Sequence, residues 1–222
     1  MALKVLELFS GTESFSKVAR ERGHITFTID NDKQFNSDLC KDIMDVELKD
    51  IPFKPNIIWA SPPCQRFSVA SISKNWVDGK PKNKETEDDI ELVHKTIKLI
   101  DDLKPKFWFI ENPRGMLRKI LELNRVTITY CQYGDSRMKP TDIWTNCYDW
   151  EDIAKSCKNG MSCHESAPRG SRTGTQGIKG AKDRSKVPKQ LCLEILKICE
   201  NNDNSQSKLK ETIKQSVAED RN

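Results

Sequence analysis

Two short segments of this chain carry side chains that could do chemistry. The first, Ser61–Gln65, reads Ser-Pro-Pro-Cys-Gln and follows the apolar run 57–60. The second, Glu111–Pro113, reads Glu-Asn-Pro and follows the apolar run 107–110. A cysteine thiolate is a nucleophile, and a carboxyl group can hold or transfer a proton beside it. We therefore expect Cys64 and Glu111 to face one pocket, with the prolines stiffening the turns.

The elements that must position these residues are short β-rich runs that alternate with longer amphipathic ones. Strands are predicted at 4–8, 25–29, 57–60, 107–110 and 126–130, and helices at 14–22, 89–103 and 188–199. This alternation is typical of a parallel sheet with crossover helices, so the fold class is a doubly wound, Rossmann-like α/β sheet. The carboxyl ends of such strands form the functional edge, and both segments lie there.

A second group of residues indicates a nucleoside-containing cofactor. Gly11 follows the first predicted strand at the start of a helix, and Asp30 ends the second strand. An acid about 20 residues beyond a glycine turn holds ribose hydroxyls in many such folds. Asp42, near a third strand, suits an adenine amino group. Only one glycine of the dinucleotide fingerprint is present, which favours a nucleoside without pyrophosphate, such as S-adenosylmethionine.

The charge of the chain is modest but uneven. The formal net charge is +4, and the stretch 155–189 holds nine Lys or Arg residues against two acids. This local positive field is the pattern expected for contact with a polyanion, although a solvated basic loop is the plain alternative. Eight dispersed cysteines favour a reducing compartment. No apolar run is long enough for a membrane span, and no signal peptide is seen, so we expect a soluble, intracellular protein.

These motifs, taken in order, resemble the DNA cytosine-C5 methyltransferases, and in particular their small phage-like members. The resemblance covers most of residues 4–145 and a short return near the end. It rests on Phe9-Ser10-Gly11, Asp30, Asp42, Pro63-Cys64-Gln65 and Glu111-Asn112-Pro113. The chain departs from the family pattern at Glu13, where glycine is frequent, and at Ser185, where asparagine is usual.

The resemblance implies an S-adenosylmethionine-dependent DNA (cytosine-5-)-methyltransferase. Cys64 would attack C6 of a flipped cytosine, Glu111 would hold the N3 edge of the base, and Arg137 would complete the catalytic set. It also implies double-stranded DNA as the partner. We expect a monomer in the cytoplasm of a bacterium or of a phage-infected cell.

The resemblance assigns two further sets of residues. Those expected to bind the cofactor are Phe9, Ser10, Gly11, Thr12, Glu13, Ser14, Asp30, Asn31, Asp42, Ile43, Ser61, Pro63 and Ser185. Those expected to bind the substrate are Gln65, Ser68, Asn112, Pro113, Lys139, Arg169 and Arg172.

The predicted organisation has four parts. A catalytic and cofactor-binding domain covers 1–145, and a small, loop-rich, basic target-recognition region covers 146–183. A C-terminal motif and helix, 184–200, return to the catalytic domain, and 201–222 form a flexible tail. No metal site is predicted, because Cys157, Cys163 and His164 could ligate zinc but their spacing matches no common finger.

Two alternatives stay open. An RNA methyltransferase acting on cytosine in tRNA would use the same base-binding motifs, because they describe the base and not the sugar. A catalytically inactive DNA-binding relative would keep the fold without the reaction. The sequence identifies neither the base that removes the C5 proton nor the target sequence.

Overall fold

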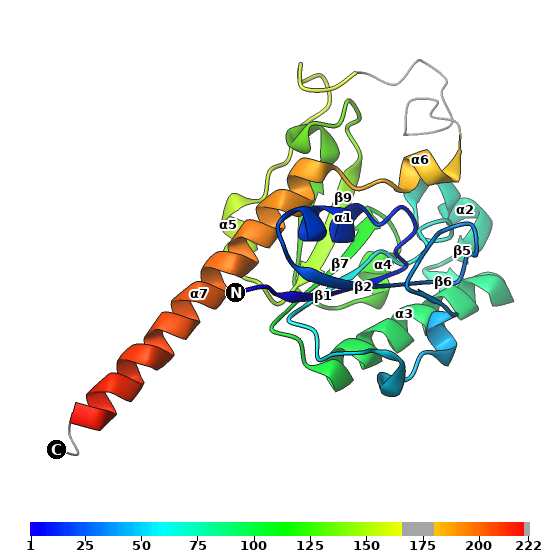
Figure 1. Ribbon diagram of the computed structural model, residues 1–222. Helices are drawn as coiled ribbons and strands as arrows, with labels where there is room; N and C mark the ends of the chain where they lie inside the picture. Colours follow the sequence, from blue (N-terminus) through cyan, green and yellow to red (C-terminus); the bar gives the residue numbers. More distant parts are fainter. Residues whose placement is uncertain (166–179, 220–222) are drawn as a thin grey trace.

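The computed structural model describes residues 1–165 and 180–219, and the side chains of all of these except 181 and 205–219. Its centre is a seven-stranded sheet with the order β3-β2-β1-β4-β7-β9-β8 (Figure 1). The strands are β1 Lys4–Leu8, β2 Ile25–Asp30, β3 Leu39–Cys40, β4 Ile57–Ala60, β7 Phe107–Pro113, β9 Pro140–Thr145 and β8 Arg125–Thr129. β3, β2, β1, β4 and β7 are parallel, and β9 is antiparallel to both of its neighbours.

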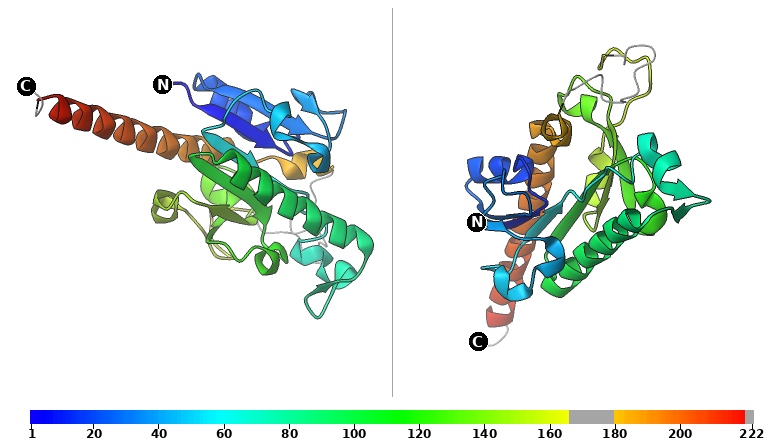
Figure 2. Two further views of the ribbon diagram at one scale, coloured as in Figure 1. Left: turned by 90° about the horizontal axis from the view of Figure 1, so that it is seen from below. Right: turned by 90° about the vertical axis from the view of Figure 1, so that its right-hand side faces the viewer.

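Helices cover both faces of the sheet, as Figure 2 shows from two sides. The long helices are α1 Ser14–Glu21, α3 Lys84–Leu103 and α7 Lys189–Glu219. The short helices are α2 Ile72–Asn75, α4 Leu117–Ile120, α5 Asp149–Ile153 and α6 Ala181–Ser185, together with the 3-10 turns Ile43–Asp45, Leu48–Asp50, Val69–Ser71 and η4 Tyr130–Tyr133. A two-stranded hairpin, β5 Trp76–Val77 and β6 Lys80–Pro81, precedes α3.

The alternation of side chains along the strands produces two hydrophobic cores. Val5, Trp59 and Phe109 face α1 and α7, while their sequence neighbours face α3 on the other side. The Phe15 ring from α1 stacks on Trp59 with centroids 4.7 Å apart. Since parallel strands are buried on both faces, continuous apolar runs such as 57–60 are what this topology requires.

The predicted strands are confirmed in position. The structure adds one strand, β9, and changes the neighbour of the strand predicted at 126–130. The sequence does not predict β9, whose run is interrupted by Asp142, a fully buried acid that pairs with Arg118 of α4. β9 is antiparallel and lies between β7 and β8, so the strand predicted at 126–130 runs in the direction of β7 without touching it.

The chain end also differs from expectation. The sequence predicts a flexible tail beyond residue 200, but α7 continues as a helix to Glu219 and projects beyond the body of the molecule in Figures 1 and 2. The stretch is polar, yet Lys, Glu and Gln favour helix, and extending a packed helix avoids the cost of nucleation. In the described residues no helix is long and apolar enough to cross a membrane.

Candidate active site

Cys64 lies just beyond the carboxyl end of β4, where its backbone makes a tight turn. Its carbonyl oxygen accepts hydrogen bonds from the Phe67 N–H at 3.2 Å and the Ser68 N–H at 3.0 Å. Burial raises the pKa of the Cys64 thiol above its ordinary value, Lys139 lowers it, Glu111 raises it further and Arg184 lowers it. The thiol is therefore protonated at neutral pH until its surroundings change.

Glu111 belongs to β7, the strand that pairs with β4 in parallel. Ala60 and Ile110 are partners in the register, so the two strands leave the sheet at the same level. The Glu111 carboxylate is 5% exposed. Its Oε1 accepts a hydrogen bond of 2.8 Å from the Tyr130 hydroxyl and lies 3.9 Å from Lys139 Nζ. A buried carboxylate held on one oxygen can offer the other to a ligand.

Asn112 joins the two chemical segments. Its Nδ2 donates a 2.9 Å hydrogen bond to the carbonyl oxygen of Pro62, and the residue is fully buried. Its Oδ1 has no hydrogen-bond partner in the described part of the chain. Because an unpaired buried acceptor is costly, this oxygen is a candidate contact for a bound ligand or water.

The loop after β7 also presses against the loop that carries Cys64. Met116 N donates to the Phe67 carbonyl oxygen at 2.7 Å, and Gly115 forms a bridge with Ser68. A Cβ atom at Gly115 would lie 1.9 Å from that same carbonyl oxygen. Only glycine permits this approach, which fixes the distance between the two loops.

The cations predicted near the nucleophile are arranged differently from expectation. The Arg137 guanidinium is held by the Asp135 carboxylate, with Nε donating to Oδ1 at 2.7 Å, and its Nη1 donates to the Asp183 carbonyl oxygen at 3.5 Å. Lys139 is the cation beside the acid and the largest charge lowering the Cys64 pKa. The sequence predicts Lys139 as a substrate ligand and Arg137 as the catalytic cation.

Tyr130 and Arg184 are the residues that sequence reasoning missed. Tyr130 directly follows β8, and because β8 runs in the direction of β7, its carboxyl end lies at the same edge of the sheet as Glu111. A tyrosine at the carboxyl end of the predicted strand 126–130 was the available signal. The Arg184 carbonyl oxygen accepts a 3.3 Å hydrogen bond from Lys139 Nζ, which ties α6 to the acid.

The turn after β1 has an unusual backbone. Phe9, Gly11 and Glu13 all have positive φ, at 57°, 46° and 54°. Gly11 N donates a 2.7 Å hydrogen bond to Asp30 Oδ2, and Asp32 N donates to Asp30 Oδ1 at 2.9 Å. Strained backbone of this kind persists where the surroundings hold it, often at ligand sites.

Six of the predicted cofactor residues line one hollow at this edge of the sheet. They are Phe9, Asp30, Asn31, Asp42, Ile43 and Pro63. Asn31 Nδ2 donates to Asp42 Oδ2 at 3.2 Å, while Asp42 Oδ1 accepts from the Met44 N–H. The hollow thus has apolar walls and two carboxylates whose remaining lone pairs can accept from hydroxyl or amino groups.

The other predicted cofactor residues are distributed around the turn. Thr12 and Ser14 line a neighbouring hollow with Val187, whose N–H donates to Ser14 Oγ at 3.2 Å. Ser10 is buried, and its Oγ has no hydrogen-bond partner among the described residues. The unpaired Ser10 hydroxyl is a candidate contact for a bound ligand at this turn.

The remaining three cofactor candidates already have partners on the protein. Glu13 forms an ion pair with Arg20. Ser61 Oγ accepts a 3.0 Å hydrogen bond from Trp59 Nε1. Ser185 is exposed on α6 and donates to the Lys182 carbonyl oxygen.

Glu7 contacts the start of α1, which follows the turn after β1. Its carboxylate accepts hydrogen bonds from the N–H groups of Phe15 and Ser16, at 3.3 and 2.8 Å, in the first turn of α1. Burial, the dominant influence, raises the pKa of Glu7 to about 7. A group that satisfies helix N–H donors in this way fixes where the helix begins.

The predicted substrate residues fall into three groups. Asn112, Pro113 and Lys139 lie with Glu111, as described above. Gln65 is exposed, and Ser68 Oγ contacts Ser71 Oγ at 3.3 Å. Arg169 and Arg172 lie outside the described residues.

The cysteines predicted as possible metal ligands gather into one group. Cys157, Cys163 and His164 lie together with Cys131, which the sequence does not place with them. Cys147, the other nearby cysteine, is buried in the core around Trp150 instead.

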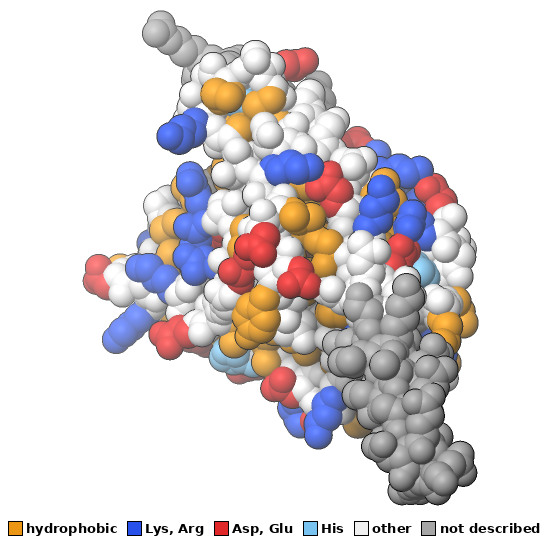
Figure 3. Space-filling model, turned by 90° about the vertical axis from the view of Figure 1, so that its left-hand side faces the viewer, with side chains coloured by type: hydrophobic (Ala, Val, Ile, Leu, Met, Phe, Trp, Pro, Cys, Tyr) orange, Lys and Arg blue, Asp and Glu red, His pale blue; other side chains and the backbone are white. Residues whose placement is uncertain are grey.

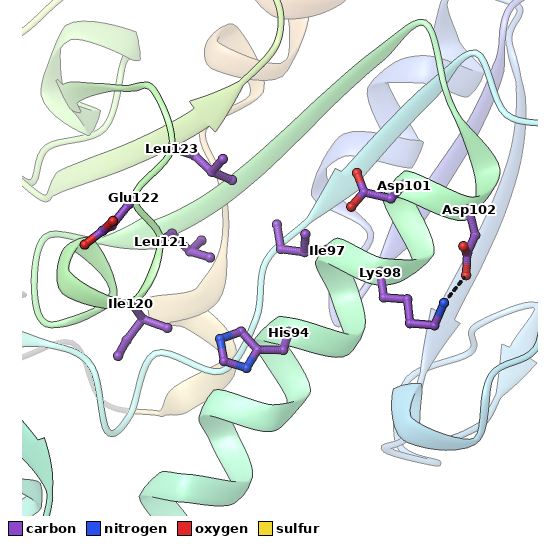
Figure 4. Close-up of a pocket in the computed structure, with 9 residues that line it drawn as sticks. All are labelled: His94, Ile97, Lys98, Asp101, Asp102, Ile120, Leu121, Glu122 and Leu123. Atoms are coloured by element: carbon purple, nitrogen blue, oxygen red, sulfur yellow. Dashed lines mark hydrogen bonds and ion pairs between the residues drawn. The ribbon is translucent and has the colours of Figure 1, made fainter.

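A larger hollow, with a volume of about 580 Å³, lies elsewhere on the surface. Figure 4 shows it between α3 and residues 120–123, with the His94 ring at its side. Its lining includes no residue from the functional edge of the sheet, so we do not assign the chemistry there. On the face shown in Figure 3, acidic and basic side chains both occur, and neither sign dominates.

The chain is similar to known DNA methyltransferases. The family model for the C-5 cytosine-specific DNA methylase matches residues 3–131. A "Probable DNA (cytosine-5)-methyltransferase" of Frog virus 3 (isolate Goorha) is 31% identical over 219 residues, which cover 89% of this chain and 100% of the relative. The type II methyltransferase M.FnuDI of Fusobacterium nucleatum is 30% identical over 128 residues, 53% of this chain and 34% of the relative.

Among solved structures, a DNA modification methyltransferase encoded within an E. coli prophage superposes with a TM-score of 0.48 at 18% identity. The match covers 65% of this chain, and this chain spans 46% of the length of that protein.

Proposed function

Because the chain belongs to the C-5 cytosine-specific DNA methylase family, we propose that it is an S-adenosylmethionine-dependent DNA (cytosine-5-)-methyltransferase that uses Cys64 as its nucleophile. The observation that carries the proposal is the pairing of β4 with β7. It sets a half-buried thiol and a buried carboxylate at one edge of the sheet, joined by the Asn112 to Pro62 hydrogen bond.

The reaction begins when the Cys64 thiolate forms a bond to C6 of cytosine. The electrons of the C5–C6 double bond then move toward C5, which becomes nucleophilic. S-adenosylmethionine, when bound, would supply the methyl group that C5 takes up, and it would leave as the neutral thioether S-adenosylhomocysteine. Transfer of the C5 proton to a base or a water and release of the Cys64 thiolate restore the double bond, so the thiolate is regenerated.

Glu111 has two tasks in this sequence. Its free oxygen binds the N3 and amino edge of cytosine, which fixes C6 above Cys64, while Tyr130 holds the other oxygen. A proton taken up from solvent and held between N3 and the carboxylate would reduce the negative charge on Glu111. That charge is one of the causes raising the Cys64 pKa, so binding the base favours the thiolate.

Lys139 carries a positive charge that lowers the Cys64 pKa and so counteracts the effect of burial. It lowers the pKa of the thiol more than any other charged residue does, and its Nζ lies 3.9 Å from Glu111 Oε1. With less negative charge on Glu111, the positive charges of Lys139 and Arg184 lower the Cys64 pKa with less opposition. Binding of cytosine would thus favour the thiolate.

The cofactor would lie across the turn after β1. Asp30 would accept from the ribose hydroxyls, Asp42 from the adenine amino group, and Ser10 with the α1 N-terminus would meet the carboxylate. Pro63, which lines the same hollow as Asp30 and Asp42, would border the cofactor.

The substrate we propose is double-stranded DNA, bound by a monomer in the cytoplasm. The C5 and C6 atoms are inaccessible inside a duplex, so the target cytosine must flip out of the stack at a cost of a few kcal/mol. The basic stretch 155–189 would offset this cost by binding phosphates, which predicts affinity that falls steeply with salt.

The test is covalent trapping on duplex DNA that contains 5-fluorocytosine, because fluorine blocks loss of the group at C5. We expect an adduct that survives denaturing electrophoresis and needs S-adenosylmethionine. Cys64→Ala forms none, while Cys40→Ser, which changes an exposed cysteine, forms as much as the wild type. An adduct with Cys64→Ala, or methyl transfer to tRNA but not to duplex DNA, contradicts the proposal.

A further inference from the structure

Four potential metal ligands converge beside Tyr130, although one of them, Cys131, is 26 residues from the next in sequence. The Sγ atoms of Cys131, Cys157 and Cys163 and a ring nitrogen of His164 all lie within 4.8 Å of one another. Cys131 is in η4, directly after β8, and the other three follow α5. All three cysteines are free thiols.

The separations resemble those around a tetrahedral zinc ion. Bonds of about 2.3 Å to sulfur and about 2.0 Å to nitrogen place two sulfurs about 3.8 Å apart and sulfur and nitrogen about 3.5 Å apart. Cys131 and Cys163 Sγ are 3.8 Å apart, and His164 Nδ1 lies 3.5 Å from Cys163 Sγ and 3.7 Å from Cys157 Sγ. The Cys131 to Cys157 separation, 3.1 Å, has to open slightly.

We propose that Cys131, Cys157, Cys163 and His164 bind one zinc ion in a structural Cys₃His site. Four neutral or deprotonated ligands with no open position are typical of structural zinc. A disulfide between Cys131 and Cys157 is the competing arrangement. It would leave Cys163 and His164 without a reason to converge, and a sulfur–sulfur distance of 3.1 Å exceeds the bonded length of about 2.0 Å.

The surrounding hydrogen bonds hold the ligands in place. Gln132 Nε2 donates to Cys163 Sγ at 3.1 Å, which stabilises negative charge on that sulfur. Cys157 N donates to Thr129 Oγ1 at 2.9 Å, and Glu165 N donates to the Ser136 carbonyl oxygen at 3.1 Å. Such outer contacts orient metal ligands and tune their charge.

The site would fasten the start of the basic region to the catalytic sheet. Cys131 is adjacent to Tyr130, whose hydroxyl donates to Glu111, and His164 lies one residue before the end of the described segment at 165. A metal at this point therefore fixes both the entry to the region predicted to recognise DNA and the residue that orients the catalytic acid.

The experiment measures metal content on the full chain, independently of methyl transfer. We expect about one zinc per chain by elemental analysis in wild type and in Cys40→Ser, and little in Cys157→Ser and His164→Ala, whose positions are partly exposed. Cobalt exchanged into the wild type should show thiolate-to-metal charge transfer that Cys163→Ser weakens.

Two results would overturn the zinc site. One is the absence of zinc from folded wild type after dialysis against zinc and removal of loosely bound metal. Equal zinc content in Cys157→Ser, His164→Ala and Cys40→Ser would count in the same way. The other is a Cys131–Cys157 disulfide found by non-reducing peptide mapping of protein kept under reducing cytosolic conditions. Metal content is measured directly. A loss of methyl transfer caused by a defect at Cys64 would therefore produce neither result.

Discussion

The hydrogen bond from Tyr130 to Glu111 offers the sharpest test of the site geometry. Tyr130→Phe removes one oxygen atom and leaves the ring, which is fully buried and lies under Lys139 Nζ at 4.6 Å from the ring centroid. Glu111 loses its 2.8 Å partner on Oε1. The carboxylate stays buried and keeps only Lys139, 3.9 Å away, on that side.

The size of the effect follows from the charge on the acceptor. A hydrogen bond to a charged group contributes about 1.5–3 kcal/mol, and leaving the group unsatisfied costs a similar amount. Lys139 compensates in part, so we expect the free energy of unfolding to fall by about 1.5–2 kcal/mol. If the acid also loses its orientation toward cytosine, turnover falls by roughly 10-fold for each 1.4 kcal/mol lost at the transition state.

The measurements are urea unfolding and single-turnover methylation of duplex DNA. Tyr148→Phe is the matched control, since Tyr148 is 70% exposed and should change neither. A double-mutant cycle with Glu111→Gln, read by urea unfolding, isolates the pair, because the cost of Tyr130→Phe should shrink when the carboxylate is absent. Equal stability and turnover in Tyr130→Phe and Tyr148→Phe would refute the assigned role.

Three further changes probe how the site is built. Gly115→Ala places a Cβ 1.9 Å from the Phe67 carbonyl oxygen, so the Cys64 loop must shift and single-turnover methylation should fall by about 100-fold. Burial raises the pKa of Glu7 from its ordinary value of 4.5 to about 7, so its contribution to stability is complete below pH 4.5 and is lost as pH rises through 7. Glu7→Gln should flatten this dependence of the urea midpoint on pH. Arg118→Ala leaves the fully buried Asp142 carboxylate without its cation and should lower the free energy of unfolding by about 3 kcal/mol in urea.

Each of these has a clear contrary outcome. Wild-type turnover in Gly115→Ala would show that the loop contact does not set the active-site distance. A wild-type slope between pH 4.5 and 7 in Glu7→Gln would assign the titration to another group. For Arg118, the control is Arg125→Ala on exposed β8 surface, and equal stability of the two variants would mean that Asp142 finds another partner.

The parallel part of the fold could be predicted because its signals are local. Buried runs such as 57–60 and 107–110 end in polar motifs, and the parallel topology alone brings those ends to one edge. The same reasoning places the cofactor turn and Asp30 together, since β1 and β2 are neighbours.

The parts that escaped prediction depend on pairings between distant residues. β9 was hidden because Asp142 breaks its apolar pattern, and only the Arg118 partner makes that acid acceptable inside the sheet. Cys131 could not be joined to Cys157 by spacing, because 26 residues and β9 separate them. Lys139 reaches the acid from β9's start, a position that requires the same unpredicted strand.

Both ends of the basic region are fastened to groups that set the charge around Cys64. At its end, the carbonyl oxygen of Arg184 holds Lys139 Nζ, the main charge lowering the pKa of the thiol. At its start, Cys157 lies against Cys131, next to the Tyr130 that holds Glu111. Moving either end must therefore alter the balance between Lys139 and Glu111 at the thiol. Under the proposed function, a duplex bound correctly at this region would keep both contacts in place, and one bound incorrectly would disturb the charge around Cys64. Recognition and reactivity would then be linked through charge rather than through a large rearrangement of the sheet.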